Sequence, residues 1–350
     1  MKVLVTGANG HLGFNVCKAF VEAGHEVRAS IRSADDHIKA DPLRAIGVTD
    51  IVGLNVRSRE PFVDACRGID VLLHVAATYA MRPDGPAAVA SLIGDSVEGA
   101  ENAVRAAAAA GVPKVVLTSS VATLPRVAPD APATTETDWA SDLAVPYFRA
   151  KVEGERAAWK AAEATGVTLV TILPGTIGGP GFLRPTPSID LLRGIMRGQL
   201  RFGAPNANVP YVDARDAAAA HLLAATRDVT GRFIVVNDHV PSLREVSMLM
   251  NDIDSTVRAA PFLLPDVFLE AGPALDWARS KIFGGPRLVS RAVVATMKGK
   301  ITKVNTARAK TELGWHQQIP IDVSLRETMA AIRSLYQPHR RLPQRRHHIG

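Results

Sequence analysis

The chain begins Met1-Lys-Val-Leu-Val-Thr-Gly7-Ala-Asn-Gly10-His-Leu-Gly13, and this stretch decides its fold. A short apolar run ends in glycines spaced three residues apart, and an amphipathic helical pattern follows. Gly7 permits a sharp turn, Gly10 lets a pyrophosphate approach the backbone, and Gly13 permits close packing of helix on strand. We therefore expect a dinucleotide on the free N–H groups where the helix begins. The residues expected to contact it are Gly7, Asn9, Gly10, His11, Leu12 and Gly13.

The first half of the chain alternates short apolar runs with longer helical patterns. The predicted strands are residues 2–6, 26–31, 50–55, 70–76, 114–119 and 168–173, and the predicted helices are residues 11–23, 61–66, 86–110 and 146–165. Strands that alternate with helices and are apolar on both faces indicate a parallel sheet covered on both sides. The sequence thus predicts an α/β fold of the doubly wound, Rossmann type.

After Pro174 the rhythm loosens, because stretches rich in glycine and proline interrupt the helical patterns. Helices are predicted at residues 214–226, 244–252, 269–282, 291–297, 306–313 and 323–335, with one more strand at 233–237. We expect residues 1–174 to form the dinucleotide-binding domain, with a strand and helix near 212–240 returning to it. Residues 175–337 should form a smaller, mostly helical substrate lobe, and residues 338–350 a disordered basic tail.

Composition narrows the class of protein. The chain has 350 residues, 47% of them hydrophobic, which suffices for a large core. Its longest uncharged stretch, residues 164–183, contains two prolines and five glycines, so we expect no stable insertion into a membrane. Two cysteines and no signal peptide predict a cytoplasmic protein with reduced thiols. The histidines and cysteines lack metal-ligand spacing, so no metal is expected.

The formal net charge is +7, and much of the excess lies in residues 339–348. We interpret this basic tail as solvated rather than as a nucleic-acid or lipid contact, since no nucleic-acid-binding motif accompanies it. Self-association as a homodimer is left open.

The adenosine end of the cofactor should be read after the second strand. An enzyme that prefers NAD usually carries Asp or Glu there, but this chain carries Arg32, with Lys39 further along. A guanidinium can donate two parallel hydrogen bonds to a 2′-phosphate. The sequence therefore favours NADP(H), with NAD(H) possible; the alternative is that Arg32 is only a solvated surface charge.

A candidate catalytic pair begins a helix in Val145-Pro-Tyr147-Phe-Arg-Ala-Lys151, with Ser141 or Asp142 available to cap it. Tyr147 and Lys151 are four residues apart and share one helix face. A nearby ammonium lowers the pKa of a phenol, which then can exchange a proton with a carbonyl oxygen or an alcohol. Alone this spacing is common on helix surfaces, but Thr118-Ser-Ser120 ends a buried strand, where Ser120 could donate to the substrate oxygen.

Together, the glycine loop, Thr118-Ser-Ser120 and Tyr147-x-x-x-Lys151 resemble the extended short-chain dehydrogenase/reductase family. The likeness is greatest to the branch with dihydroflavonol 4-reductase, 3β-hydroxysteroid dehydrogenases and NAD-dependent epimerase/dehydratases. Further matching stretches are His74-Val-Ala76-Ala77, Asn102 with its neighbours, Val212-Asp-Ala-Arg-Asp216 and Ala309-Lys-Thr-Glu-Leu-Gly-Trp315. The resemblance extends to about residue 335.

The resemblance implies roles for individual residues. Tyr147 would exchange the proton, Lys151 would also bind the nicotinamide ribose, and Ser120 would orient the substrate carbonyl. Other cofactor contacts would be Val56, Ala76, Ala77 and Pro174, and Asn55 stands where the family often has an Asp that touches the adenine. The asparagine can still accept from the adenine amine, so little loss is expected. His74, on a buried strand, is interpreted as a core residue rather than a base.

Three functions compete. The first is a reductase or dehydrogenase in which Tyr147 protonates a carbonyl oxygen as hydride reaches its carbon, or the reverse. The second is a nucleotide-sugar epimerase or dehydratase with retained NAD, and the third is a redox sensor without turnover. Nucleotide-sugar members of the family usually carry Arg-x-x-Asn after the sixth strand, which residues 171–180 lack. Phe182, Leu183 and residues 262–269 favour an apolar pocket for an aromatic, steroid-like or terpenoid carbonyl compound, although core packing is the favoured interpretation of residues 262–269.

Overall fold

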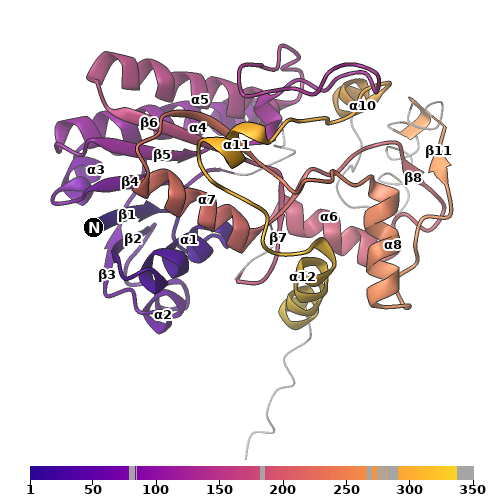
Figure 1. Ribbon diagram of the computed structural model, residues 1–350, viewed down its shortest axis with the longest axis horizontal. Coiled ribbons are helices and arrows are strands. Elements are labelled where there is room, and N and C mark those ends of the chain that lie inside the picture. Colours follow the sequence, from indigo (N-terminus) through magenta and orange to yellow (C-terminus); the bar gives the residue numbers. More distant parts are fainter. Residues whose placement is uncertain are drawn as a thin grey trace, which may run out of the picture.

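A seven-stranded parallel sheet forms the centre of the computed structural model (Figure 1). The structure describes residues 1–78, 83, 85–181, 186–265, 270–272, 274, 277, 281 and 291–336. The strands of the sheet are β1 (Lys2–Thr6), β2 (Glu26–Ile31), β3 (Asp50–Gly53), β4 (Val71–His74), β5 (Lys114–Thr118), β6 (Thr168–Pro174) and β10 (Gly231–Val235). Their order, β10-β6-β5-β4-β1-β2-β3, reverses direction between β1 and β4, and such a switch point places a ligand crevice at the carboxyl ends of the strands. The predicted doubly wound fold is confirmed.

Helices cover both faces of the sheet because the strands are apolar on both faces. On β1, Val3 and Val5 pack into one core and Leu4 into the other. The first core lies under α1 (His11–Glu22), α2 (His37–Ala45) and α7 (Ala214–Thr226). The second lies under α3 (Arg59–Cys66), α4 (Gly85–Ala109) and α5 (Pro146–Thr165). Both cysteines are free and buried, one in each core.

The edge strand β10 pairs with β6 although more than fifty residues separate them, with Val235 opposite Pro174. Helix α7 packs on α1 and connects to β10, so this segment of the second half completes the sheet and one of its helical layers.

A smaller lobe lies beyond the carboxyl edge of the sheet (Figure 1). Its core joins side chains of α6 (Pro187–Met196), α8 (Leu243–Ile253) and α12 (Ile321–Tyr336). Helix α8 begins with the capping box that Ser242 and Glu245 form. The remaining elements are β7 (Thr176–Gly178) paired with β9 (Tyr211–Asp213), β8 (Ala204–Pro205) paired with β11 (Leu263–Leu264), α10 (Arg291–Met297) and α11 (Ala307–Thr311).

Several details differ from the sequence prediction. Helices α2 and α6 and the two small parallel pairs were not predicted; α2 contains Pro42, and β8 and β11 have two residues each. The core packing favoured for residues 262–269 fails for Phe262 and Leu263, which are 54% and 44% exposed. Most of the helix predicted at residues 269–282 lies outside the described residues, as do Phe182, Leu183 and the tail.

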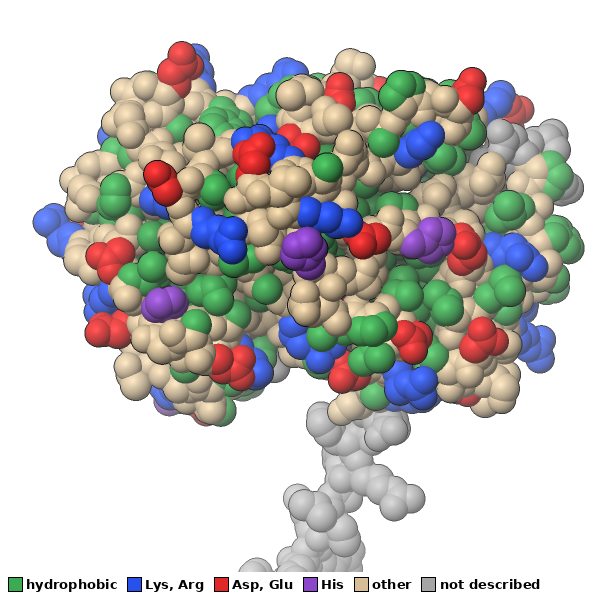
Figure 2. Space-filling view, in the orientation of Figure 1, with side chains coloured by type: hydrophobic (Ala, Val, Ile, Leu, Met, Phe, Trp, Pro, Cys, Tyr) green, Lys and Arg blue, Asp and Glu red, His purple; other side chains and the backbone are tan. Residues whose placement is uncertain are grey.

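The face of the molecule in Figure 2 shows no dominant field of one charge. On the face in Figure 2, Lys and Arg side chains alternate with Asp and Glu over both lobes. Within the described residues, no helix is both long and apolar enough to cross a membrane. The same residues hold no cluster of three His, Cys, Asp or Glu side chains suited to a metal ion.

Candidate active site

The glycine loop between β1 and α1 has no room for side chains at two positions. Gly7 has φ +67°, and a Cβ there would lie 2.7 Å from Cα of Ala76. At Gly13, a Cβ would lie 2.2 Å from the carbonyl oxygen of Gly7. The loop is thus folded back onto its own helix and pressed against the segment after β4, which brings Ala76 to the same edge as Gly7.

The first turn of α1 is suited to an anion. Gly10 is its N-cap, no side chain caps it, and no acidic residue lies in its first turn. The first N–H groups of a helix lack intrahelical acceptors, and the helix dipole adds positive potential there. The loop therefore fits the pyrophosphate of a dinucleotide, whose approach the missing side chains permit.

His11 takes part in the loop through its side chain. Its ring Nε2 lies 3.2 Å from the carbonyl oxygen of Pro180, to which the Asn15 side-chain amide also donates. Burial lowers the pKa of His11 to about 4, so the ring is neutral at pH 7. These contacts tie the start of α1 to the segment after β7, a link between lobes that the sequence did not reveal.

At the adenosine end, the two predicted cations differ. Lys39 forms an ion pair with Asp36, one turn earlier, which leaves it less suited to a phosphate. Arg32 follows β2, is exposed, and has no hydrogen bond or ion pair to any described residue. Of the two, Arg32 is therefore the better placed to meet a 2′-phosphate.

Side-chain hydrogen bonds of two asparagines fix the backbone that follows β3 beside this site. The Asn55 side-chain oxygen accepts from the backbone N–H of Arg57 at 3.2 Å, so it already has a partner other than an adenine. Asn102 of α4 donates to the carbonyl oxygens of Val56 and Arg57 at 3.3 and 3.1 Å. Asn102 thus fixes the backbone of Val56. The predicted cofactor contact Ala77, which follows β4, is exposed.

Helix α5 presents Tyr147 and Lys151 at the carboxyl edge of the sheet. Pro146 is its first residue, as predicted, but the predicted cap is wrong: Val145 is the N-cap, and Asp142 accepts from the N–H of Ala144 instead. Tyr147 is 7% exposed, and the Lys151 ammonium donates to the carbonyl oxygen of Thr118 at 3.4 Å.

Burial lowers the pKa of Lys151 to about 8, and the charge of Glu155 partly opposes this shift. Lys151 is a base, so it is mostly protonated below pH 8 and loses its charge above that pH. Its ammonium is desolvated one helical turn after Tyr147, and a charge in such a position acts more strongly than in water. Such a cation favours the phenolate form of a neighbouring tyrosine.

Ser120 begins the short helix η1 (Val121–Thr123), which packs on α5. Its Oγ accepts from the N–H of Ala122 at 3.1 Å. This hydrogen bond uses a lone pair and fixes the side chain, but it leaves the hydroxyl proton for an outside acceptor. Ser120 can therefore donate to a substrate oxygen, the role predicted for it. Pro174 ends β6 in a fully buried position at the same edge.

The two hydroxyl residues before Ser120 form hydrogen bonds with side chains of α7 and α5. Thr118 donates to His221 of α7, and Ser119 donates to Glu155 of α5 at 2.5 Å. Glu155 also accepts from Thr171 at 2.7 Å and forms a buried ion pair with Arg232 of β10 at 2.8 Å. This pair was not predicted from the sequence, although a carboxylate four residues after Lys151 is a visible signal.

Two buried histidines flank the site. The Nδ1–H of His221 donates to the carbonyl oxygen of Ala217 at 2.8 Å, so its Nε2 accepts the Thr118 hydroxyl. His74, on β4, lies 3.0 Å from the Thr6 hydroxyl. Burial lowers the pKa of His221 to about 4 and of His74 to about 3, where the Lys151 charge adds to the effect. Both rings are neutral in the folded protein near pH 7.

We expect the free energy of unfolding to fall as the pH drops from 6.5 to about 4. In this range unfolded histidines bind protons but His221 stays neutral in the fold, so acid favours unfolding. The expected loss is ~3 kcal/mol for His221 alone. Urea denaturation at pH 7, 6 and 5 measures the first ~2 kcal/mol of this loss. His221→Gln should reduce the slope, part of which His11 and His74 retain, and His37→Gln, at an exposed site, should not. Equal slopes for the three proteins would refute this assignment.

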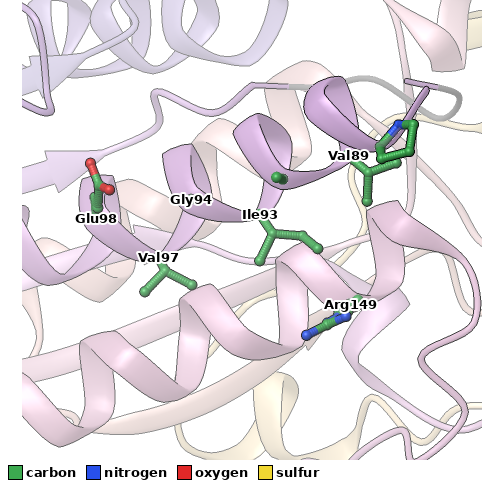
Figure 3. Close-up of a pocket in the computed structure, with 8 residues that line it drawn as sticks. Val89, Ile93, Gly94, Val97, Glu98 and Arg149 are labelled. Carbon is green, nitrogen blue, oxygen red and sulfur yellow. The ribbon is translucent and has the colours of Figure 1, made fainter. Parts of the chain in front are cut away.

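A groove between α4 and α5 lies apart from these residues (Figure 3). Val89, Ile93 and Val97 of α4 point toward α5, which contributes Arg149. None of the predicted site residues lines the groove.

The fold and the site define a dinucleotide-binding α/β protein with a tyrosine–lysine pair at the carboxyl edge of its sheet. Residues 3–237 match the model of the NAD dependent epimerase/dehydratase family. The chain therefore belongs to this family, and the resemblance seen in the sequence is confirmed.

Sequence and structure comparisons with known proteins support this assignment. The chain is 31% identical to a putative dihydroflavonol 4-reductase of Synechocystis, over 67% of this chain and 68% of that one. It is 29% identical to cinnamoyl-CoA reductase 1 of Petunia hybrida, over 66% of this chain and 71% of the other. The crystal structure of gox2253 superposes with a TM-score of 0.79 at 25% identity, covering 95% of this chain and 98% of that chain.

Proposed function

We propose that this chain is an NADP(H)-dependent oxidoreductase that interconverts a carbonyl group and an alcohol on a small, largely apolar molecule. The observation that carries this proposal is the buried ammonium of Lys151, one helical turn from Tyr147 at the edge that also holds the glycine loop. The names of the two relatives, both reductases, support the same direction.

The cofactor, when bound, supplies a hydride to the carbonyl carbon or accepts one from the alcohol. Tyr147 donates its phenolic proton to the carbonyl oxygen during reduction, because Lys151 stabilises the phenolate left behind. Ser120 donates a hydrogen bond to the same oxygen as negative charge develops on it. In the direction of oxidation the phenolate accepts the alcohol proton.

The segment after β6 favours this function over nucleotide-sugar chemistry. Residues 175–181 carry neither a cation nor a side-chain amide. A desolvated diphosphate needs such partners. Arginines do occur elsewhere in the lobe, and among them Arg193 stacks on Tyr336 while Arg215 pairs with Asp213 and Glu327.

Turnover tests the proposal directly. Purified protein is assayed with NADPH and a panel of aromatic, steroid and terpenoid aldehydes and ketones, and UDP is titrated by calorimetry. The proposal expects reduction of members of the panel and no binding of UDP. Micromolar binding of UDP without carbonyl reduction would instead establish the epimerase or dehydratase alternative.

The cofactor preference depends on Arg32. We expect a Kd for NADPH well below that for NADH, and Arg32→Ala should close most of this gap by removing the donor to the 2′-phosphate. Fluorescence titration of both cofactors measures it. Lys39→Ala is the matched control and should change little, because Lys39 pairs with Asp36. Equal affinities of the unmodified protein for the two cofactors would refute the preference.

A further inference from the structure

The segment that follows Ser120 carries a cation to the boundary between the two lobes. Leu124 packs with Leu173 and Val236 near the carboxyl ends of β6 and β10. Val127 then pairs with Ile301 through two backbone hydrogen bonds of 3.0 and 2.8 Å. Arg126 lies between these anchors, so its backbone is fixed on both sides near the carboxyl edge of the sheet.

The Arg126 guanidinium is partly buried yet has no hydrogen bond or ion pair to any described residue. It lies over the face of the Phe148 ring, 5.8 Å from the ring centroid. By contrast, the buried Arg232 donates to Glu155, Thr123 and the carbonyl oxygens of residues 136 and 138. Burial lowers the pKa of Arg126, and among the described residues no carboxylate raises it again.

A partly buried arginine without an acceptor lowers the stability of the ligand-free protein. A guanidinium stays protonated in proteins and has five donors to satisfy. Removing it from water without an acceptor costs free energy. An anion that accepts two hydrogen bonds from the guanidinium would offset this cost. The contact with Phe148 holds the group in place but satisfies none of its N–H donors.

The position of Phe148 shows what Arg126 faces. Phe148 follows Tyr147 on the first turn of α5, and the two rings lie 6.2 Å apart between centroids. That turn carries no acidic residue. The Arg126 guanidinium and the ring of the proposed proton donor therefore both contact the Phe148 ring at the first turn of α5.

We infer that Arg126 binds an anionic group, a carboxylate or a phosphate, on the carbonyl substrate. This inference rests on the proposed function. It specifies the substrate as a carbonyl compound with an apolar body, suited to the Phe148 ring, and an acidic group that the guanidinium binds through two parallel hydrogen bonds.

The test compares two aldehydes that differ in charge, 4-carboxybenzaldehyde and its methyl ester, with NADPH. The unmodified protein should reduce the carboxylate with the higher kcat/KM, and Arg126→Leu should lower that value ~10–100-fold, as expected for hydrogen bonds to a charged group. The ester should change little. Arg156→Leu is the matched control, since Arg156 is an exposed arginine that stacks on Trp139. An unchanged ratio of the two substrates in Arg126→Leu would overturn the inference while leaving the proposed function intact.

A second measurement does not need turnover. 4-Carboxybenzyl alcohol and benzyl phosphate are titrated onto the protein saturated with NADP⁺. At least one of the two compounds should bind to the unmodified protein, and its affinity for Arg126→Leu should be ~10-fold or more lower. The compound that binds more strongly identifies the anion as a carboxylate or a phosphate. Affinities independent of Arg126 would overturn the inference. Arg126-dependent binding without any aldehyde reduction would support the inference but refute the proposed function. Thermal unfolding without ligand should show Arg126→Leu no less stable than the unmodified protein, which establishes that the variant is folded.

Discussion

Replacing Tyr147 by phenylalanine is expected to lower kcat by ~10²–10⁴-fold, the usual contribution of general acid–base catalysis. The ring remains to fill its 7% exposed site, so only the proton-exchanging oxygen is lost. Cofactor affinity should survive, because the glycine loop and Lys151 are unchanged. Steady-state kinetics with a reduced carbonyl compound and fluorescence titration of NADPH measure the two effects separately.

Tyr336→Phe is the matched control. Tyr336 ends α12 and stacks under Arg193, in the other lobe, so turnover should stay within twofold of normal. Near-normal turnover of Tyr147→Phe would exclude the mechanism. A loss of cofactor binding in the same variant would show that the tyrosine acts through the fold instead.

The sheet could be predicted because local signals were strong. The strands are short apolar runs bounded by glycines and helical patterns, and both faces of the strands inside the sheet are buried, whereas the edge strand β3 is only half-buried. The smaller elements could not be predicted in this way. Strands β8 and β11 are two residues long, and their pairing depends on contacts between distant segments rather than on any local preference.

The site was predictable to the extent that its chemistry is encoded in short motifs. The glycine loop and the Tyr147–Lys151 spacing place their residues through local geometry alone. Arg232 and Arg126 gave no such signal. Arg232 is a lone arginine on an apolar strand, and its carboxylate partner lies on a helix 77 residues earlier. Arg126 is distinguished only because no described residue accepts a hydrogen bond from it, and a sequence does not show this.

The buried pair of Glu155 and Arg232 should be the most sensitive point of the fold. The two side chains are 1% and 7% exposed, and the guanidinium also stacks on Trp139 at 3.8 Å from the ring centroid. Glu155→Leu leaves Arg232 without its counterion and removes the acceptor of Ser119 and Thr171. We expect it to lower the free energy of unfolding by ~3–5 kcal/mol, as for other broken buried pairs. Urea denaturation at pH 7 measures the loss.

Three further variants distinguish the pair from its surroundings. Glu155→Gln keeps an acceptor oxygen and should lose less than Glu155→Leu, which gives a measurable protein if the leucine variant fails to fold. Glu155→Leu combined with Arg232→Met should be more stable than Glu155→Leu alone, since the uncompensated guanidinium is gone. On the same helix, Glu153 pairs with Arg149 at the surface, so Glu153→Leu should change stability by less than ~0.5 kcal/mol. If Glu155→Leu and Glu153→Leu cost the same, the buried pair does not stabilise the fold, and the packing of α5 on β6 must have another cause.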